Sequence, residues 1–167
     1  FAWSSLVMVG FADLYIRIPK PEIQSIDLEW DDGHLAYYLA VAEEFAQWWR
    51  KARSGALDDG GGKRLNLVAI LARLGAVFQA ANYPQGLDGP AGAYAPLTSK
   101  QRTVIDYLAD NHADGRKTIV FATSPHLLSL LASQLNARGV ESVLYTGQIP
   151  RQRRTRALNQ RFRYGPC

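Results

Sequence analysis

The chain has 167 residues, of which 47% are hydrophobic and 20% charged, which is typical of a soluble globular protein long enough to bury a core. Its net charge is +4, and its one cysteine, Cys167, excludes an internal disulfide and favours a reducing compartment such as the cytoplasm. The apolar stretch 1–9 is too short to span a bilayer and has no basic leader, so we expect neither a membrane helix nor a signal peptide there.

The net charge conceals an asymmetry between the two ends of the chain. From Gly115 onward there are nine Lys or Arg and one acidic residue, Glu141, which gives +8. The preceding residues hold ten basic and fourteen acidic side chains, which gives −4. A basic end joined to a mildly acidic one indicates that the basic end meets a polyanion.

The first half of the chain is predicted to be mainly helical. Ile26, Leu28 and Trp30 alternate with acidic residues, as in a half-buried strand. Asp31 and Asp32 then suit the start of a long amphipathic helix. We expect the buried stripe of this helix to consist of Leu35, Tyr38, Leu39, Ala42, Phe45 and Trp49.

Two Gly-rich breaks interrupt the predicted helices. Residues 54–62 form a flexible linker, and residues 84–96 form a Gly/Pro loop. The helix between these breaks ends near residue 82, and the next helix is capped by Ser99 and ends at 114–115. The residues predicted to be buried on these two helices are Leu67, Leu71, Leu74 and Phe78, then Val104, Ile105 and Leu108.

The remaining third predicts two strands that alternate with two helices. Residues 118–122 are rich in β-branched and aromatic side chains, as in a buried strand, and Ser124 followed by Pro125 suits the start of a helix that Gly139 ends. Residues 140–145 predict a second strand, and Pro150 opens an arginine-rich helix. This order is that of a βαβ unit, which builds parallel sheets.

These same residues carry a resemblance to a known family. The run 117–121, the leucine-rich helix, Gly139, 145–147, Pro150, an arginine and Phe162 resemble the start of the second RecA-like lobe of superfamily 2 helicases, and in particular of Swi/Snf-type DNA translocases. Residues 18–21, 79–84 and 99–100 are similar to the family's segments before that lobe. The resemblance implies an α/β fold: a partial RecA-like (P-loop NTPase-type) lobe with parallel strands and flanking helices.

The resemblance also implies a domain division and a function. Residues 1–97 are identified as a helical inter-lobe segment, and residues 98–167 as the truncated first part of the lobe, so we expect the chain to be a piece of a longer polypeptide. The intact enzyme would be an ATP-dependent translocase or helicase that uses ATP and Mg²⁺, acts on duplex DNA and pairs this lobe with a first lobe. By itself the chain is expected to be inactive and to bind no cofactor or membrane, and self-association through surfaces that the missing parts cover stays open. The resemblance implies a location in a bacterial cytoplasm or beside nucleic acid inside the cell.

The candidate site consists of residues that would hold a nucleic-acid backbone. Hydroxyl groups and helix amides at the end of the first strand hold phosphate in the resembled family, although Ser124 is equally suited to capping its helix. Gly147 either allows a close backbone approach or simply makes a turn. Six arginines within residues 151–163 repel one another and require a counter-charge. The candidate nucleic-acid-binding residues are Thr123, Ser124, His126, Gly147, Arg153, Arg154 and Arg156.

Other functions remain open. The chain also fits a superfamily 2 helicase that acts on RNA, or a non-catalytic module that binds nucleic acid or protein through the basic helix. A Rossmann-like metabolic enzyme is less favoured, because no Gly-rich fingerprint follows either predicted strand. The three histidines lack metal-ligand spacing, so we predict no metal site. The adjacent carboxylates 31–32 and 43–44 point different ways on a helix and do not form an acid/base pair, so we predict no catalytic residue in this chain.

Overall fold

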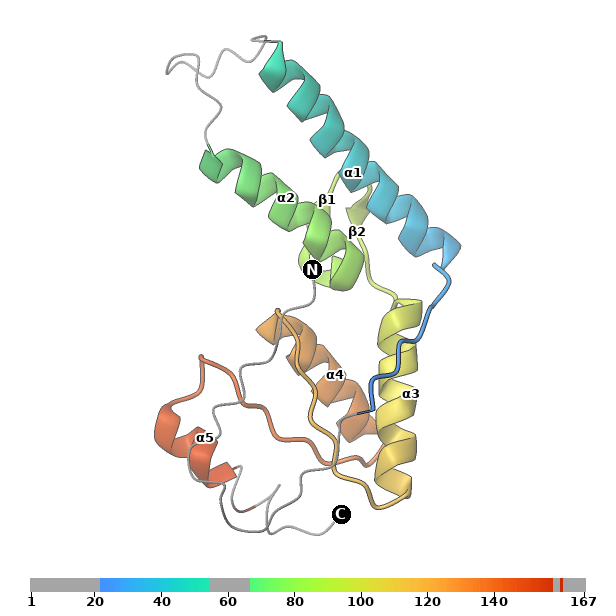
Figure 1. Cartoon of the computed structure of the whole chain (residues 1–167), viewed down its shortest axis with the longest axis vertical. Coiled ribbons are helices and arrows are strands. Elements are labelled where there is room, and N and C mark those ends of the chain that lie inside the picture. Colours follow the sequence, from blue (N-terminus) through green and yellow to red (C-terminus); the bar gives the residue numbers. More distant parts are fainter. Residues whose placement is uncertain (1–21, 55–66, 158–159, 161–167) are drawn as a thin grey trace.

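The computed structural model describes residues 22–54, 67–157 and 160, and these form a predominantly helical protein (Figure 1). Between the second and third helices lie a 3-10 turn, η1 (Pro84–Gly86), and two very short strands, β1 (Asp88–Gly89) and β2 (Gly92–Ala93). The helices are α1 (Asp32–Arg53), α2 (Leu67–Asn82), α3 (Ser99–Ala113), α4 (Pro125–Ala137) and α5 (Arg151–Ala157).

The prediction of a partial RecA-like lobe with parallel strands is wrong. The sheet that the described residues form has two strands and is antiparallel, with Asp88 opposite Ala93 and Gly89 opposite Gly92. Residues 118–122 and 142–145 are extended, but no backbone hydrogen bond joins them to each other or to another described residue. A strand needs such bonds to a neighbour about 4.8 Å away. Moreover, Ile119 is 64% and Phe121 91% exposed, which does not fit a buried strand.

The strand expected at residues 26–30 is also absent. This segment is extended and its apolar side chains are exposed, Ile26 by 62%. It runs beside the start of α3 instead, where the Ser99 hydroxyl donates to the Glu29 carbonyl over 2.8 Å. The alternation of apolar and acidic residues therefore reflects a connecting segment held by α3, not a sheet.

Helix ends were predicted well. Ser124 caps α4, with Pro125 as its first residue, and Gly139 lies just beyond its end with a φ of 79°, a left-handed conformation that favours glycine. Helix α2 ends at Asn82. At α3 the cap is Thr98 rather than Ser99, because Thr98 and Gln101 form a reciprocal capping box.

The buried faces of the first two helices differ from the predicted stripes. Helix α1 buries His34, Tyr37 and Val41, which lie one position away from the predicted face, and it leaves Leu39 53% exposed. The side chain of α2 that is buried completely is the small Ala80, whereas three of its four predicted core residues are exposed. Both sets of positions recur at helical spacing, so periodicity alone did not distinguish the face that meets a neighbour.

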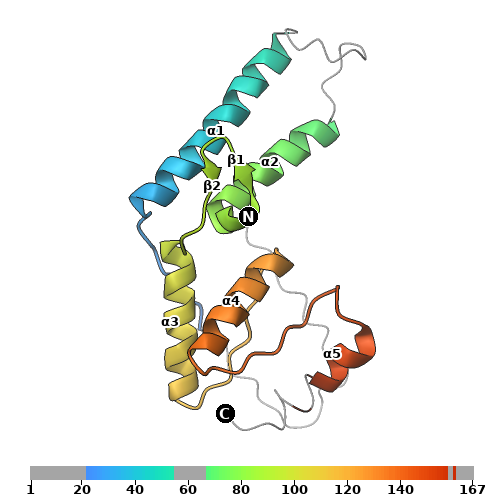
Figure 2. The same cartoon turned by 180° about the vertical axis from the view of Figure 1, so that it is seen from behind.

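The described residues bury two hydrophobic cores, one at each end of the molecule (Figures 1 and 2). Helices α1 and α2 enclose the first core with the β1–β2 hairpin, and here the Tyr37 hydroxyl donates to the Leu87 carbonyl over 2.7 Å. The predicted Gly/Pro loop 84–96 is therefore part of a packed unit. Helices α3 and α4 enclose the second core, which includes Ile105 and Leu108 as predicted.

Side chains around the start of α3 join the two ends. Asp31 accepts a hydrogen bond from the Ser99 N–H, over 2.5 Å, and also pairs with Arg102. The Gln101 amide donates to the Asn82 carbonyl at the end of α2, over 3.2 Å. The expectations placed on residues 1–21, on most of the 54–62 linker and on Phe162 lie outside the described residues.

Candidate nucleic-acid interface

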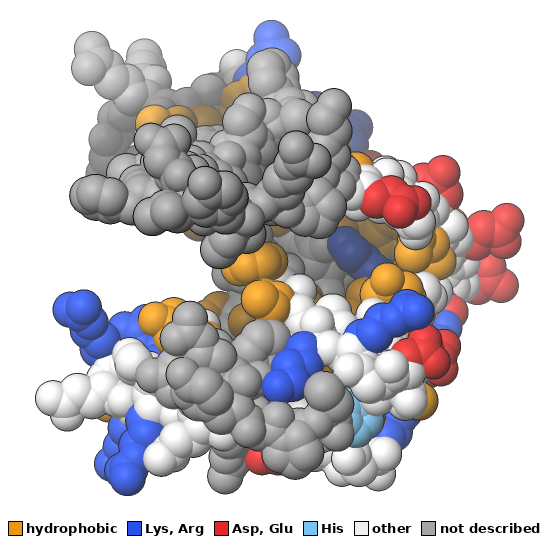
Figure 3. Space-filling model, turned by 60° about the horizontal axis from the view of Figure 1, so that its bottom comes forward, with side chains coloured by type: hydrophobic (Ala, Val, Ile, Leu, Met, Phe, Trp, Pro, Cys, Tyr) orange, Lys and Arg blue, Asp and Glu red, His pale blue; other side chains and the backbone are white. Residues whose placement is uncertain are grey.

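Helix α5 presents a row of arginines to solvent. Pro150 precedes this helix and its carbonyl accepts the Arg154 N–H over 3.1 Å, so the predicted start is confirmed. Arg151, Arg153 and Arg156 are exposed, and the seven residues of α5 include no acidic side chain. Figure 3 shows basic side chains projecting on the side of the molecule where α5 lies. This exposed row is suited to an anionic partner.

Arg154 differs from the other arginines of α5 because its side chain is turned inward. Its guanidinium lies over the ring of Tyr145, 5.0 Å from the ring centre, and its Nε is buried without a hydrogen-bond partner. Such a cation–π contact holds the arginine in place. Arg154 therefore anchors α5 to the extended segment before it, while Arg153 and Arg156 remain accessible.

The predicted hydroxyl and histidine positions cluster at the start of α4. Thr123 and His126 are exposed, and the half-buried Ser124 accepts a hydrogen bond from the Leu127 N–H over 3.3 Å. The capping role of Ser124 is thus confirmed, and its O–H hydrogen is not used by that bond. Since Pro125 has no N–H and the Leu127 N–H is engaged by the cap, the first turn of α4 offers fewer amides to an anion than most helices do.

Gly147 lies in an exposed turn between the second extended segment and α5. The Thr146 carbonyl accepts the Ile149 N–H over 3.2 Å across this turn. A side chain at position 147 would meet nothing within 4 Å. Among the described residues, therefore, neither crowding nor a left-handed backbone requires glycine here.

The predicted residues come together only in part. The start of α4 and the turn that leads into α5 lie toward the same side of the molecule in both views (Figures 1 and 2). Tyr145 was not predicted to anchor α5, although an aromatic residue nine positions before Arg154 is visible in the sequence. Gln152 and Thr155 were not predicted as site residues either, and they line a shallow hollow on α5 together with Arg151 and Arg156.

The described ranges contain no group of three or more His, Cys, Asp or Glu side chains that could hold a metal ion. No helix within them has both the length and the apolar character needed to cross a membrane.

No protein-family model matches the chain, and no curated protein or solved structure matches it either.

Proposed function

We propose that the chain binds the sugar-phosphate backbone of nucleic acid, with duplex DNA as the favoured partner, through the exposed face of α5. The observation that carries the proposal is the solvent-exposed set Arg151, Arg153 and Arg156 on a helix without acidic residues. Like charges this close repel one another, and each phosphate they neutralise releases counterions. Binding therefore lowers the free energy of this surface.

The geometry of α5 suits contact with phosphates rather than with base edges. Arg153 and Arg156 are three residues apart, so their side chains leave the helix about 5–6 Å from each other on one face. Arginine forks bind phosphate oxygens through two parallel hydrogen bonds. Because the contact between Arg154 and Tyr145 fixes the position of α5, it also fixes where Arg153 and Arg156 leave the helix. We expect binding that depends little on base sequence.

The start of α4 would supply secondary contacts. The Ser124 hydroxyl retains a hydrogen to donate, and the exposed Thr123 and His126 lie beside it. The two hydroxyl groups contribute less than the arginines, because they carry no charge and release no counterions on binding phosphate.

A duplex-binding titration tests the proposal. The double variant Arg153→Gln/Arg156→Gln removes two exposed charges, each worth about 0.5–1 kcal/mol at a solvated site, so affinity should fall roughly tenfold. The matched control is Lys51→Gln/Arg53→Gln, which removes the same charge from the exposed end of α1. Equal losses in both variants would show a general charge effect and would contradict a site on α5.

The proposal covers contact with the nucleic-acid backbone and does not include ATP hydrolysis or movement along DNA. The ATP-dependent translocase or helicase implied by the resemblance uses a parallel RecA-like sheet, which the described residues do not form. ATP and Mg²⁺ binding by a longer polypeptide therefore stays a prediction. An RNA duplex titrated beside DNA distinguishes an RNA-binding module, because A-form RNA presents its phosphates in a different geometry.

A further inference from the structure

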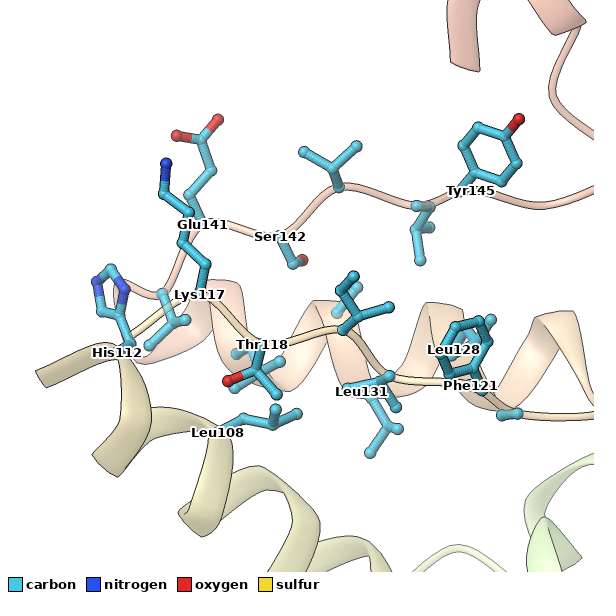
Figure 4. A pocket seen from close by; sticks show the side chains of 18 of the residues that line it. Leu108, His112, Lys117, Thr118, Phe121, Leu128, Leu131, Glu141, Ser142 and Tyr145 are labelled. Atoms are coloured by element: carbon cyan, nitrogen blue, oxygen red, sulfur yellow. The ribbon is translucent and has the colours of Figure 1, made fainter. Parts of the chain in front are cut away.

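An apolar slot separates the two extended segments near α4. Residues 118–122 and 142–145 run in the same direction along its two sides and line one pocket of about 480 Å³ (Figure 4). The floor of the slot comes from α3 and α4 and includes Leu108, Leu131 and Leu135, which belong to the second core. The slot thus lies over the second core, and the leucines at its floor are 6–8% exposed.

The backbones on both sides of the slot lack hydrogen-bonding partners in the described part of the chain. Every residue there carries one N–H and one C=O, and the two segments exchange none of these bonds. Unpaired groups along an extended segment are a template for another strand. Here two such templates line a single slot, so one inserted strand would pair with the facing edge of each.

The side chains of the slot indicate the chemistry of its occupant. The floor is aliphatic except for His112 at the end of α3, and the Ser142 hydroxyl is buried without a partner. Alternate side chains of an inserted strand would point to this floor and must therefore be apolar. The remaining side chains of the inserted strand would point to solvent, as the exposed Ile119 does. A small ligand could cover the leucines but would leave the backbone groups unpaired. The basic residues Arg116 and Lys117 also line the slot, but they precede residues 118–122 and are not part of the floor, where a nucleic acid would find no Lys or Arg.

We propose that this slot binds an extended, apolar segment of a partner protein by β-strand addition, with backbone hydrogen bonds to both flanking segments. Five residues of such a strand span about 17 Å, which matches the length of residues 118–122. The proposal is independent of nucleic-acid binding, because it uses the backbone of 118–122 and 142–145 and none of the arginines of α5.

Synthetic peptides test the slot on the full chain. The probe is a fluorescein-labelled, eight-residue peptide with Val at alternate positions and Ser or Lys between them. Its matched control has the same side chains but carries N-methyl groups on alternate amides. This change removes the N–H hydrogen-bond donors along one edge of the peptide strand. Anisotropy measures affinity, and NMR hydrogen exchange measures the protection of individual backbone amides.

We expect the probe to bind and to slow amide exchange at least tenfold in both 118–122 and 142–145, with affinity at least tenfold weaker for the N-methylated control. Absence of binding would overturn the proposal, as would equal affinity of the two peptides. Protection confined to one segment would also overturn it, because a strand between the two must pair with both.

Discussion

The guanidinium of Arg154 lies 5.0 Å from the centre of the Tyr145 ring, and this contact ties the basic helix to the extended segment that precedes it. The contact separates the arginines of α5 into one that positions the helix and others that remain exposed. It also makes the ring of Tyr145 a determinant of how those exposed charges are presented.

Tyr145→Leu should therefore weaken DNA binding, although Tyr145 itself need not touch DNA. An exposed cation–π contact contributes about 0.5–1 kcal/mol, so the expected loss in affinity is roughly two- to fivefold by anisotropy. Tyr145→Phe keeps the ring face and should bind like the parent protein. If the Leu and Phe variants bind equally well, the ring does not position α5.

Asp31 should matter for stability far more than its neighbours in the same segment. Its carboxylate accepts the Ser99 N–H and pairs with Arg102, so Asp31→Ala leaves two groups at the start of α3 without their partner. We expect a loss of about 1–3 kcal/mol in the free energy of unfolding, measured with urea. The exposed Asp27 provides the control, since Asp27→Ala should change stability by less than about 0.5 kcal/mol. Similar values for the two variants would contradict the role assigned to Asp31.

Gln101 joins α2 to α3 through a buried amide. Its Oε1 accepts the Thr98 N–H over 3.2 Å, and its Nε2 donates to Asn82 and Gln85. Gln101→Ala leaves the Asn82 carbonyl and the Thr98 N–H unpaired and should cost about 1–3 kcal/mol in thermal or urea unfolding. The exposed Gln47, whose amide donates to Glu43, is the matched control, and Gln47→Ala should be nearly neutral.

Tyr37 should make stability fall at alkaline pH. Burial raises the pKa of its hydroxyl above 10.0 and outweighs the opposing hydrogen bond from the Gly89 backbone. The folded state therefore holds the proton more tightly than the unfolded chain. This contribution to stability is complete below about pH 10 and is lost as the pH rises through the raised value.

Tyr37→Phe removes that titration together with the bond to the Leu87 carbonyl. At neutral pH the variant should be less stable by about 1 kcal/mol. Above pH 10 the difference from the parent protein should shrink, as followed by urea unfolding across the pH range. A difference that stays constant from pH 7 to 11 would show that the Tyr37 pKa does not change on folding.

The features predicted correctly from sequence are those that depend on neighbouring residues. Ser124, Pro125 and Gly139 set the ends of α4 through capping and backbone preferences that act within one turn. The capping box at α3 is visible in the sequence as Thr98 followed three residues later by Gln101, whereas the predicted cap was Ser99.

The features missed from sequence depend on contacts between distant segments. Residues 118–122 have strand-like composition, yet a strand exists only when another backbone pairs with it, and no local pattern specifies that pairing. His34 was not expected in a core, but its ring forms a 2.8 Å hydrogen bond with the Ala80 carbonyl, which permits its burial. The inward turn of Arg154 likewise depends on where Tyr145 lies.

The salt dependence of duplex binding tests the central claim most directly. The logarithm of the binding constant should fall linearly with the logarithm of salt concentration, with a slope of about −0.9 for each phosphate neutralised. Arg153→Gln/Arg156→Gln should make the slope shallower by about 1.8, while Lys51→Gln/Arg53→Gln should leave it unchanged. A slope that the α5 variant does not alter would contradict the account.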